Sequence, residues 1–312
     1  MKKKALIGVT GATGMIGKRL VEELVRRNEN VRILVRKKSR LDKVEEIVGD
    51  VNNLDDLKRF TKGLTEIYHL AALIDLTNGW EDFFKTNVES AVNLEILCKK
   101  QKIRLMLVST IMTFKDTGKK IRNEKWREEN VFSENKYIRS KVLLNKEFRK
   151  MRSNTILIYP SIVIDKEKIN STEFKGGNFE KFIWKFVGGG IPGGVMELIG
   201  SSKRYINVIE INDLVNGMIL AMKKAKARED YLLVGQNIFA KDYLERFSRI
   251  CKTNYCRVRI PEIVLKIIKN VPWFSIYPIW LKNLLVSIPK NMNFSNKKAV
   301  RHFNFKIESK LC

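Results

Sequence analysis

The sequence predicts an α/β fold with a doubly wound parallel sheet, and three observations support this prediction. An apolar run at residues 5–9 leads into three glycines with the spacing G-x-x-G-x-x-G, and an amphipathic helix follows them. Further apolar runs recur along the first half of the chain, separated by segments with helical spacing. This alternation is typical of parallel sheets covered by helices. At 312 residues, the chain can form one such domain together with a small C-terminal α/β lobe.

The glycine-rich stretch has the residue types and the spacing of a dinucleotide-binding loop. Gly11 allows a tight turn, Gly14 lets the backbone approach a pyrophosphate, and Gly17 lets the helix pack against the strand. The first N–H groups of the following helix, at the positive end of its dipole, then face the phosphates. The stretch therefore predicts a Rossmann-type domain that binds a dinucleotide cofactor.

The second strand, predicted at residues 31–36, ends in a run of basic residues. An acidic residue at this point would bind the ribose 2′-hydroxyl of NAD, whereas this chain has Arg36-Lys37-Lys38-Ser39-Arg40. A basic cluster suits the 2′-phosphate of NADP. We therefore expect NADP(H) as the preferred cofactor and NAD(H) as the alternative. The alternative is that this basic run is a charged turn exposed to solvent and has no role in binding.

The third and fourth strands are predicted at Val44–Val48 and Glu66–Leu70. Between them, Asn52 or Asn53 can cap a helix at Leu54–Phe60. His69, in the fourth strand, is expected to be structural. The chain has one other histidine, so it offers no histidine cluster for a metal, and we expect no metal site.

The middle of the chain presents polar side chains to the same edge of the sheet. A long helix is predicted at Trp80–Lys100, and Asn87 lies among its apolar residues, where a buried amide would need partners. A fifth strand at Leu105–Ser109 ends in Ser109-Thr110. These two hydroxyls lie where a parallel sheet presents its carboxyl edge, and ligands bind at such edges.

A helix that begins at about Ser133 carries Tyr137 and Lys141. Positions four apart share a helix face, so the phenol and the ammonium are expected to lie together. A nearby cation favours the phenolate over the phenol, whose free pKa is about 10. A tyrosine with a lowered pKa could donate and accept a proton near neutral pH.

The parallel pattern stops after a sixth strand at residues 155–160. Residues 165–204 include the glycine-rich Gly188–Gly194 and are expected to lie over a site or between two lobes. We expect residues 1–164 and about 205–235 to form the dinucleotide-binding domain, and about 165–204 and 236–312 to form a substrate-binding lobe. The elements predicted in the second half are a helix at Ile211–Lys223 with Asn212 or Asp213 near its cap, a strand at Tyr231–Val234, the segment Asp242–Cys251, a strand at Val258–Ile260 and a helix at Glu262–Lys269.

The formal net charge of +26 has three explanations: a composition biased toward Lys, Asn and Ile, an anionic membrane surface, or nucleic acid. We expect no nucleic-acid partner, because the chain contains no motif of that kind. Four cysteines without a C-x-x-C pair indicate reduced thiols and a cytoplasmic location. The apolar run after Met-Lys-Lys-Lys is too short for a signal core, and no stretch approaches the ~20 residues of a membrane span.

With these motifs in this order, the chain resembles the extended short-chain dehydrogenase/reductase family, part of the NAD-dependent epimerase/dehydratase superfamily. It is most similar to the dihydroflavonol-4-reductase and 3β-hydroxysteroid-dehydrogenase-like branch. The late stretch Asn293–Ala299 looks like the family's D-N-S-K-A element, without its acidic residue. The other motifs that carry the resemblance are Thr10-Gly11-x-x-Gly14-x-x-Gly17, Gly49-Asp50-Val51, His69-Leu70-Ala71-Ala72, Asn87, Ser109-Thr110, Tyr137-x-x-x-Lys141 and Tyr159-Pro160-Ser161.

The resemblance implies a role for each of these motifs. Tyr137 would be the acid/base, and Lys141 would bind the nicotinamide ribose and lower the tyrosine pKa. Thr110 would polarise the substrate oxygen, a task that Ser109 could share. Asp50 would contact the adenine, and Asn87 would be a structural partner near the active site. The residues implied to bind the cofactor are Gly11, Thr13, Gly14, Met15, Ile16, Gly17, Arg36, Asp50, Val51, Leu70, Ala71, Ala72, Tyr137, Lys141, Tyr159, Pro160, Ser161 and Ile162.

Three functional hypotheses follow from this pattern. The first is an oxidoreductase that transfers a hydride between NADP(H) and a secondary alcohol or ketone, with Tyr137 as acid/base. The second is an NAD-dependent nucleoside-diphosphate-sugar epimerase or dehydratase, against which Arg36 argues. The third is a non-catalytic dinucleotide-binding protein, against which the intact Thr110, Tyr137 and Lys141 argue.

Residues 262–288 combine apolar and aromatic side chains with flanking lysines. Trp and Tyr favour the membrane interface, and lysines can reach the headgroups. Pro272 and Pro278 exclude a span, so the segment could lie on an anionic membrane as short amphipathic pieces. Two alternatives explain the same apolar and aromatic composition. The segment could close the substrate lobe over a hydrophobic ligand, or it could contact a second copy of the chain in a homodimer.

Overall fold

The computed structural model describes residues 5–115, 117, 120–127, 135–169, 190–191, 194–199, 205–239, 241–242, 245, 254–259 and 291–309. The predicted helix at Glu262–Lys269 and the candidate membrane segment at 262–288 lie outside these residues. Most of Gly188–Gly194 and of Asp242–Cys251 also lies outside them. The predictions for these segments therefore stay predictions.

A seven-stranded sheet forms the centre of the protein. All its neighbouring strands are parallel, in the order β11-β6-β5-β4-β1-β2-β3. The chain runs outward from β1 to one edge and then from β4 to the other, so the strand order reverses between β1 and β4, the place where open α/β sheets bind their ligands. The predicted fold class is confirmed. The strands are β1 (Leu6–Thr10), β2 (Asn30–Val35), β3 (Glu45–Val48), β4 (Glu66–His69), β5 (Arg104–Val108), β6 (Thr155–Pro160) and β11 (Asp230–Leu233).

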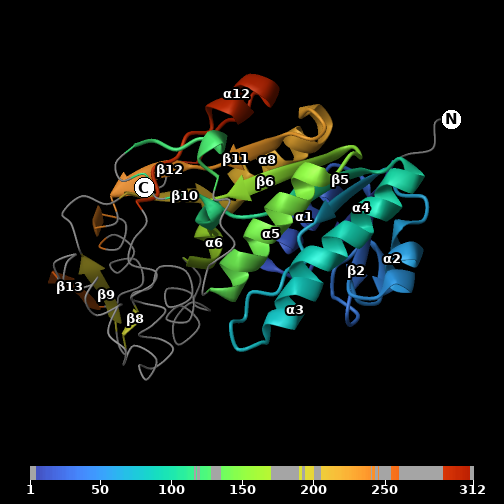
Figure 1. Cartoon of the computed structure of the whole chain (residues 1–312), viewed down its shortest axis with the longest axis horizontal. Coiled ribbons are helices and arrows are strands. Elements are labelled where there is room, and N and C mark those ends of the chain that lie inside the picture. Colours follow the sequence, from blue (N-terminus) through green and yellow to red (C-terminus); the bar gives the residue numbers. More distant parts are fainter. Residues whose placement is uncertain are drawn as a thin grey trace.

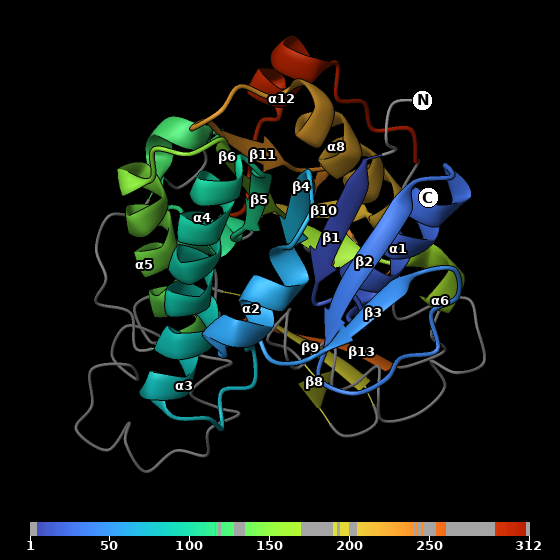
Figure 2. The same ribbon diagram turned by 90° about the vertical axis from the view of Figure 1, so that its right-hand side faces the viewer.

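Helices cover both faces of this sheet (Figures 1 and 2). On one face, α1 (Met15–Arg26) packs against α8 (Ile211–Lys224), and α12 (Lys297–Phe303) contacts α8 and β11. The other face carries α2 (Leu54–Thr61), α4 (Ser90–Gln101) and α5 (Lys136–Lys150). Two separate apolar layers result, one between the sheet and each set of helices. Burial of these faces holds the carboxyl ends of the strands in fixed positions.

The helix predicted at Trp80–Lys100 is a succession of three elements. These are α3 (Trp80–Phe84), a π-helical turn η1 (Lys85–Glu89) and α4. The apolar spacing predicted the correct span, but it carries no signal for the wider turn in the middle. This turn places Asn87 inside the protein, as described below.

Polar side chains at the starts of α2 and α8 accept hydrogen bonds from backbone N–H groups. Asn53 caps α2, because its Oδ1 accepts hydrogen bonds from the N–H groups of Asp55 (2.9 Å) and Asp56 (3.2 Å). The cap of α8 is Glu210, one residue before the helix, which accepts from Asn212 N over 2.6 Å. Asp213 instead accepts from two backbone N–H groups of the segment that follows α12.

Two small sheets come from the part of the chain where the parallel pattern stops. In one, β10 (Tyr205–Glu210) pairs in parallel with β7 (Ile162–Ile164) and antiparallel with β12 (Gln236–Phe239). In the other, β9 (Gly194–Ile199) pairs in parallel with β13 (Asn254–Arg259) and antiparallel with β8 (Gly190–Ile191). Of these strands, the sequence predicted the end of β13. The short helix α6 (Lys166–Ile169) follows β7.

Candidate active site

The glycine-rich loop between β1 and α1 forms a close-packed cradle. Gly11 has a φ of 70°, and a Cβ at this position would lie 2.6 Å from the Ala71 backbone nitrogen. A Cβ at Gly17 would lie 2.1 Å from the Gly11 carbonyl oxygen. Gly14 is the N-cap of α1 and provides no side-chain hydrogen bond, so the first N–H groups of the helix are left to solvent or a ligand. This arrangement is suited to a phosphate group.

A buried hydrogen-bond chain fastens the end of β1 to the loop after β4. Thr10 Oγ1 lies 2.8 Å from His69 Nδ1 and accepts from Ala71 N over 3.3 Å. Burial lowers the pKa of His69 to about 3, so the imidazole that shares this hydrogen bond with the Thr10 hydroxyl is neutral. Its other nitrogen lies 3.5 Å from Ser90 Oγ. His69 is thus structural in the described part of the chain.

The basic run after β2 lies on the surface beside β3. Arg36 and Arg40 are exposed, and the structure shows no ion pair for either within its described residues. Ser39 lies between them and donates hydrogen bonds from its N–H and its hydroxyl to the Glu46 carboxylate on β3. Sequence analysis did not identify Glu46. By holding Ser39, Glu46 fixes the loop on which the basic side chains are displayed.

The other residues implied to bind the cofactor follow the strands as predicted. Asp50 is half-buried, and its Oδ1 accepts from Asn52 N over 2.8 Å, which forms a tight turn after β3. Leu70, Ala71 and Ala72 are half-buried in the loop after β4. The rest of this set lies in the cradle loop and first turn of α1 (Thr13, Met15, Ile16), after β3 (Val51), at the end of β6 (Tyr159, Pro160, Ser161) and at the start of β7 (Ile162).

Tyr137 and Lys141 lie close together on α5, as their spacing predicts. Lys141 Nζ is 5.9 Å from the centre of the Tyr137 ring and donates over 2.8 Å to the Val108 carbonyl at the end of β5. Lys141 is 4% exposed, and burial lowers the pKa of its ammonium to about 8. Burial also raises the pKa of Tyr137 to about 12. The expected lowering of the Tyr137 pKa is therefore wrong for this structure, because removing the phenolate from water dominates.

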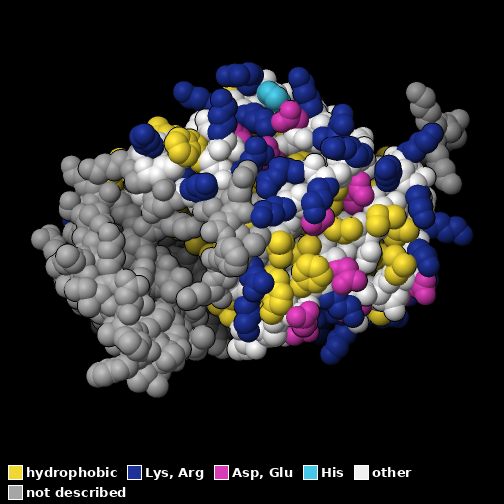
Figure 3. All heavy atoms as spheres, viewed as in Figure 1, with side chains coloured by type: hydrophobic (Ala, Val, Ile, Leu, Met, Phe, Trp, Pro, Cys, Tyr) yellow, Lys and Arg dark blue, Asp and Glu magenta, His cyan; other side chains and the backbone are white. Residues whose placement is uncertain are grey.

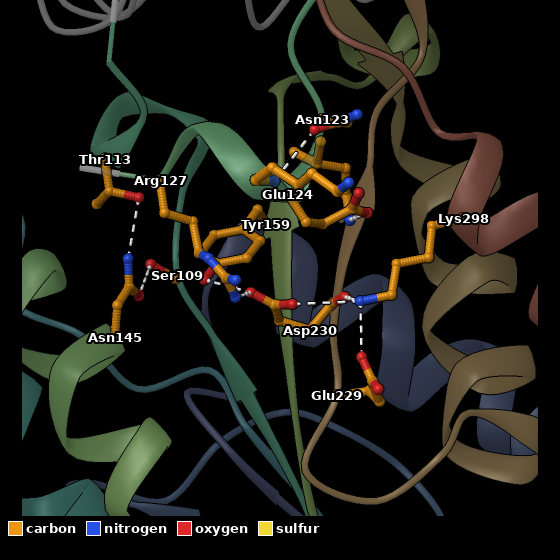
Figure 4. A network of polar contacts seen from close by, with 12 residues as sticks. Ser109, Thr113, Asn123, Glu124, Arg127, Asn145, Tyr159, Glu229, Asp230 and Lys298 are labelled. Carbon is orange, nitrogen blue, oxygen red and sulfur yellow. Dashed lines mark hydrogen bonds and ion pairs between the residues drawn. The ribbon is translucent and has the colours of Figure 1, made fainter. Parts of the chain in front are cut away.

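Ser109 and Thr110 are adjacent, but their hydroxyls have different surroundings. Ser109 is 3% exposed and donates over 2.7 Å to Asn145 Oδ1, while Asn145 Nδ2 donates over 3.0 Å to Thr113 Oγ1 (Figure 4). Thr110 is half-buried, and its Oγ1 accepts from Met112 N over 3.3 Å. Since Thr110 can still donate its proton, the geometry favours Thr110 over Ser109 as the group that polarises a substrate oxygen. Asn145 was missed, although it lies two helical turns after Tyr137.

Asn87 connects the loop after β4 to the helix that carries Tyr137. Its Oδ1 accepts from Leu73 N over 2.7 Å, and its Nδ2 donates over 2.9 Å to both Leu73 O and Ser140 Oγ. Ser140 Oγ in turn donates to Tyr137 O over 2.7 Å. The partners expected for a buried Asn87 are therefore present. The π-helical turn places this amide inside, and such turns are frequent at functional sites.

The residues at the end of β6 divide into two environments. Tyr159 is fully buried, and its hydroxyl donates over 3.0 Å to Asp230 on β11 (Figure 4). Ser161 is 7% exposed, and its Oγ is a buried polar atom for which the described structure shows no hydrogen-bond partner. An unsatisfied buried hydroxyl costs ~1–3 kcal/mol, and a polar ligand group can remove this cost. Together with the cradle at Gly11 and Gly17, this orphaned hydroxyl fits a bound dinucleotide.

A glycine cradle after β1 together with a Tyr–Lys pair held at the end of β5 is typical of enzymes that depend on a nicotinamide dinucleotide. The model of the NAD dependent epimerase/dehydratase family matches residues 7–234 of this chain. The chain belongs to this family, which confirms the resemblance found in the sequence. It is an NAD(P)-dependent enzyme with oxidoreductase chemistry.

No helix within the described residues is long and apolar enough to cross a bilayer.

Two curated relatives carry the names of the branch that the sequence resembles, and a third is named as a sterol dehydrogenase. A 3-beta-hydroxysteroid dehydrogenase from Mycolicibacterium neoaurum is 38% identical over 96 residues, which cover 28% of this chain and 26% of that protein. A putative dihydroflavonol 4-reductase from Synechocystis sp. is 25% identical over 259 residues, 78% of this chain and 71% of that protein. A decarboxylating sterol-4-alpha-carboxylate 3-dehydrogenase from Dictyostelium discoideum is 22% identical over 322 residues, 93% of each chain.

Solved structures show the same fold over almost the whole chain. A short-chain dehydrogenase/reductase superfamily protein from Agrobacterium tumefaciens with bound NAD has a TM-score of 0.73 at 16% identity, covering 98% of this chain and 93% of that one. The ADP-L-glycero-D-manno-heptose-6-epimerase of Helicobacter pylori has a TM-score of 0.69 at 16% identity, covering 100% and 94%. At these identities the likeness shows the fold alone.

Proposed function

We propose that the protein is an NADP(H)-dependent reductase or dehydrogenase that interconverts a ketone and a secondary alcohol. The observation that carries this proposal is the Tyr137–Lys141 pair, which the 2.8 Å hydrogen bond from Lys141 to Val108 ties to the strand end that precedes Thr110. The bound cofactor would supply or accept the hydride. The chain itself would bind the ketone, orient it and move one proton.

In the direction of reduction, each polar group has one task. Thr110 Oγ1 donates a hydrogen bond to the ketone oxygen, and Tyr137 transfers its phenol proton to that oxygen as the carbonyl carbon receives the hydride. Because its pKa is raised to about 12, Tyr137 holds its proton at neutral pH, as an acid must. The Lys141 ammonium lies 5.9 Å from the ring centre and stabilises the phenolate that remains.

The surface around the end of β2 supports NADP(H) over NAD(H). Arg36 and Arg40 are exposed on a loop that Glu46 holds through Ser39. Guanidinium groups match the geometry of a phosphate, and an acidic residue that would select the free ribose hydroxyl is not present at the end of this strand. The 2′-phosphate would therefore lie against Arg36.

The named relatives support a ring-bearing, largely apolar substrate. Their printed names refer to a hydroxysteroid, a dihydroflavonol and a sterol carboxylate. Each of these compounds carries a hydroxyl or ketone on a fused ring system. We therefore choose a 3-ketosteroid and a dihydroflavonol as the first test substrates.

The test combines the protein, NADPH carrying deuterium at the nicotinamide C4, and each test ketone. We expect the reduced cofactor to be consumed and deuterium to appear on the carbinol carbon of the product by mass spectrometry. Tyr137→Phe should still bind NADPH but lose ~10²–10⁴-fold in turnover, because the proton donor is removed. Tyr205→Phe is the matched control, since Tyr205 lies on β10. Wild-type turnover by Tyr137→Phe would contradict the assignment.

A sugar-nucleotide epimerase or dehydratase is the second candidate, and the name of the matching family model favours it. Such an enzyme regenerates its cofactor in each cycle, so no net NADPH consumption would accompany turnover. Tightly bound NAD in the purified protein, together with conversion of a nucleoside-diphosphate sugar, would replace the first proposal with this one.

A further inference from the structure

A pocket of about 850 Å³ lies at the amino-terminal end of the edge strand β11. Its walls come from η3 (Glu124–Trp126), the last turn of α5, the residues that precede β11, and α12. Tyr137 lies in the first turn of α5 and Arg149 in the last, about 18 Å apart along the helix axis. The pocket is therefore separate from the candidate active site.

Basic side chains are concentrated in this pocket. Eight of its 16 lining residues are Lys or Arg, compared with 60 of 312 in the whole chain. Figure 3 shows Lys and Arg gathered over the upper part of the molecule, where α12 lies in Figure 1. A composition rich in lysine would spread such residues evenly over the surface. It does not explain their concentration in one recess.

Asp230 lies on the floor of the pocket, and three side chains donate hydrogen bonds to its carboxylate. It is 3% exposed and accepts hydrogen bonds from Arg127, from the Tyr159 hydroxyl over 3.0 Å, and from Lys298 over 3.3 Å (Figure 4). Two positive charges thus surround one carboxylate. Asp230 has no capacity left to neutralise the rim of the pocket.

The other two acidic residues of the lining are also occupied. Glu229 pairs with Lys298 over 2.8 Å. Glu124 is 6% exposed and accepts from the Leu232 N–H over 3.0 Å, and burial raises the pKa of its carboxyl. Arg127 and Lys298 thus pair with Asp230 and with Glu229, whose side chain stays 42% exposed. The other six basic residues of the lining have no ion pair with these acids.

Six basic residues remain around the rim, and all are exposed. None of the six has an ion pair with another residue that the structure describes. Glu128 and Glu129 follow η3 in the sequence and lie outside the described residues, and basic residues still outnumber acidic ones when both are counted. Like charges held in a recess repel each other, and a bound anion removes this cost. The six are Lys125, Arg149, Arg152, Arg228, Lys297 and Arg301.

We propose that this pocket binds a ligand that carries two or more phosphate groups, at a site distinct from the cofactor. Its volume lies within the ~300–1,000 Å³ of small-molecule sites. Four of the six rim residues are arginines, whose planar guanidinium forks match phosphate oxygens in pairs. They come from the end of α5 and the residues just after it, from α12 and from the loop before β11, so they line the pocket from three segments of the chain. A recess of this kind favours a compact polyanion.

The test measures binding of inorganic tripolyphosphate by calorimetry, in the presence of saturating NADPH so that the cofactor site is filled. The variant carries Arg149→Gln, Arg152→Gln and Arg301→Gln, three exposed changes that disturb no contact of the described core. We expect its affinity to fall about tenfold or more, because a hydrogen bond to a charged group contributes that much to a binding constant. Wild-type binding should also weaken as salt is added.

The control variant removes the same number of charges elsewhere, with Lys62→Gln, Lys85→Gln and Lys99→Gln, all exposed and outside the pocket. The proposal requires this variant to bind as the wild type does. A second arm compares phosphatidylcholine vesicles with and without phosphatidylinositol 4,5-bisphosphate, a lipid whose headgroup carries more than one phosphate. If the protein binds these vesicles but not tripolyphosphate, and only the arginine variant loses this binding, the phosphate source is a lipid headgroup. Both variants must first show the melting temperature of the wild type. Absence of binding in both arms, or an equal loss of affinity in the two variants, would overturn the proposal.

Discussion

Replacement of Lys141 by Met removes a buried ammonium and keeps a side chain of similar length. Burial lowers the pKa of Lys141 from its usual 10.5 to about 8. A difference of this size corresponds to ~3 kcal/mol of destabilisation of the charged form. The substitution also leaves the Val108 carbonyl without the 2.8 Å hydrogen bond from Nζ, which costs ~1–3 kcal/mol. We expect Lys141→Met to raise the free energy of unfolding by ~1 kcal/mol at neutral pH.

The sign of this effect depends on pH. Because the folded pKa of about 8 lies below the usual value of 10.5, the unfolded chain binds more protons between these values, and the wild type gains stability as pH rises through them. Below this window the full cost of the buried charge is present, and above it the cost has disappeared. The advantage of the Met variant should therefore shrink with rising pH and reverse once the lost hydrogen bond alone remains.

Urea unfolding followed by circular dichroism measures this difference at neutral pH and at about pH 10. Lys146→Met, on the same helix, is the control and should show no comparable pH dependence. Activity should be lost in Lys141→Met, since no cation would remain beside Tyr137. A Lys141→Met protein that is less stable than wild type by the same amount at both pH values would refute the reasoning.

Three further predictions concern the cofactor, the π-helical turn and the membrane. Arg36→Asp should weaken NADPH binding by ~1–3 kcal/mol and favour NADH, measured by fluorescence titration of both cofactors; tighter NADPH than NADH binding in this variant would contradict it. Asn87→Leu should lower the free energy of unfolding by ~2–4 kcal/mol, because the amide's hydrogen bonds to Leu73 are lost inside the protein; a thermal melt unchanged from wild type would exclude this role. If residues 262–288 contact a membrane, the protein should float with anionic liposomes at low salt, and Trp273→Ala with Trp280→Ala should reduce flotation; a protein that stays in the aqueous fraction at low salt would end the membrane hypothesis.

The inner strands of the central sheet could be predicted because they are buried on both faces and are therefore largely apolar, as β1 and β6 are. The cradle loop was equally predictable, since Gly11 and Gly17 stand where a Cβ would collide with backbone atoms. The cap of α2 was predicted at Asn52 or Asn53 from their place before a helix, and the structure has Asn53 in this role. In each of these cases, the sequence pattern that makes the prediction lies within a few residues of the feature.

The features that sequence analysis missed depend on contacts between distant segments. The partners of Asn87 come from a loop 14 residues away and from α5, and no local pattern signals the π-helical turn that places it inside. The strands β7, β10 and β12 are three to six residues long and pair across large sequence separations. The raised pKa of Tyr137 follows from burial of the phenol, which the Tyr-x-x-x-Lys spacing does not report.

The contacts of Glu124 and Lys298 with β11 also occupy backbone groups on an edge strand of the sheet. β11 is an edge strand, and Glu124 occupies the Leu232 N–H while Lys298 donates over 2.6 Å to the Asp230 carbonyl. Unpaired backbone groups at a sheet edge are a template for another chain, and these two side chains occupy such groups on β11. The opposite edge, β3, is four residues long and begins with two glutamates. Displacement of η3 or α12 would therefore open β11 to pairing between molecules, while the candidate active site at the other end of the strands stays intact.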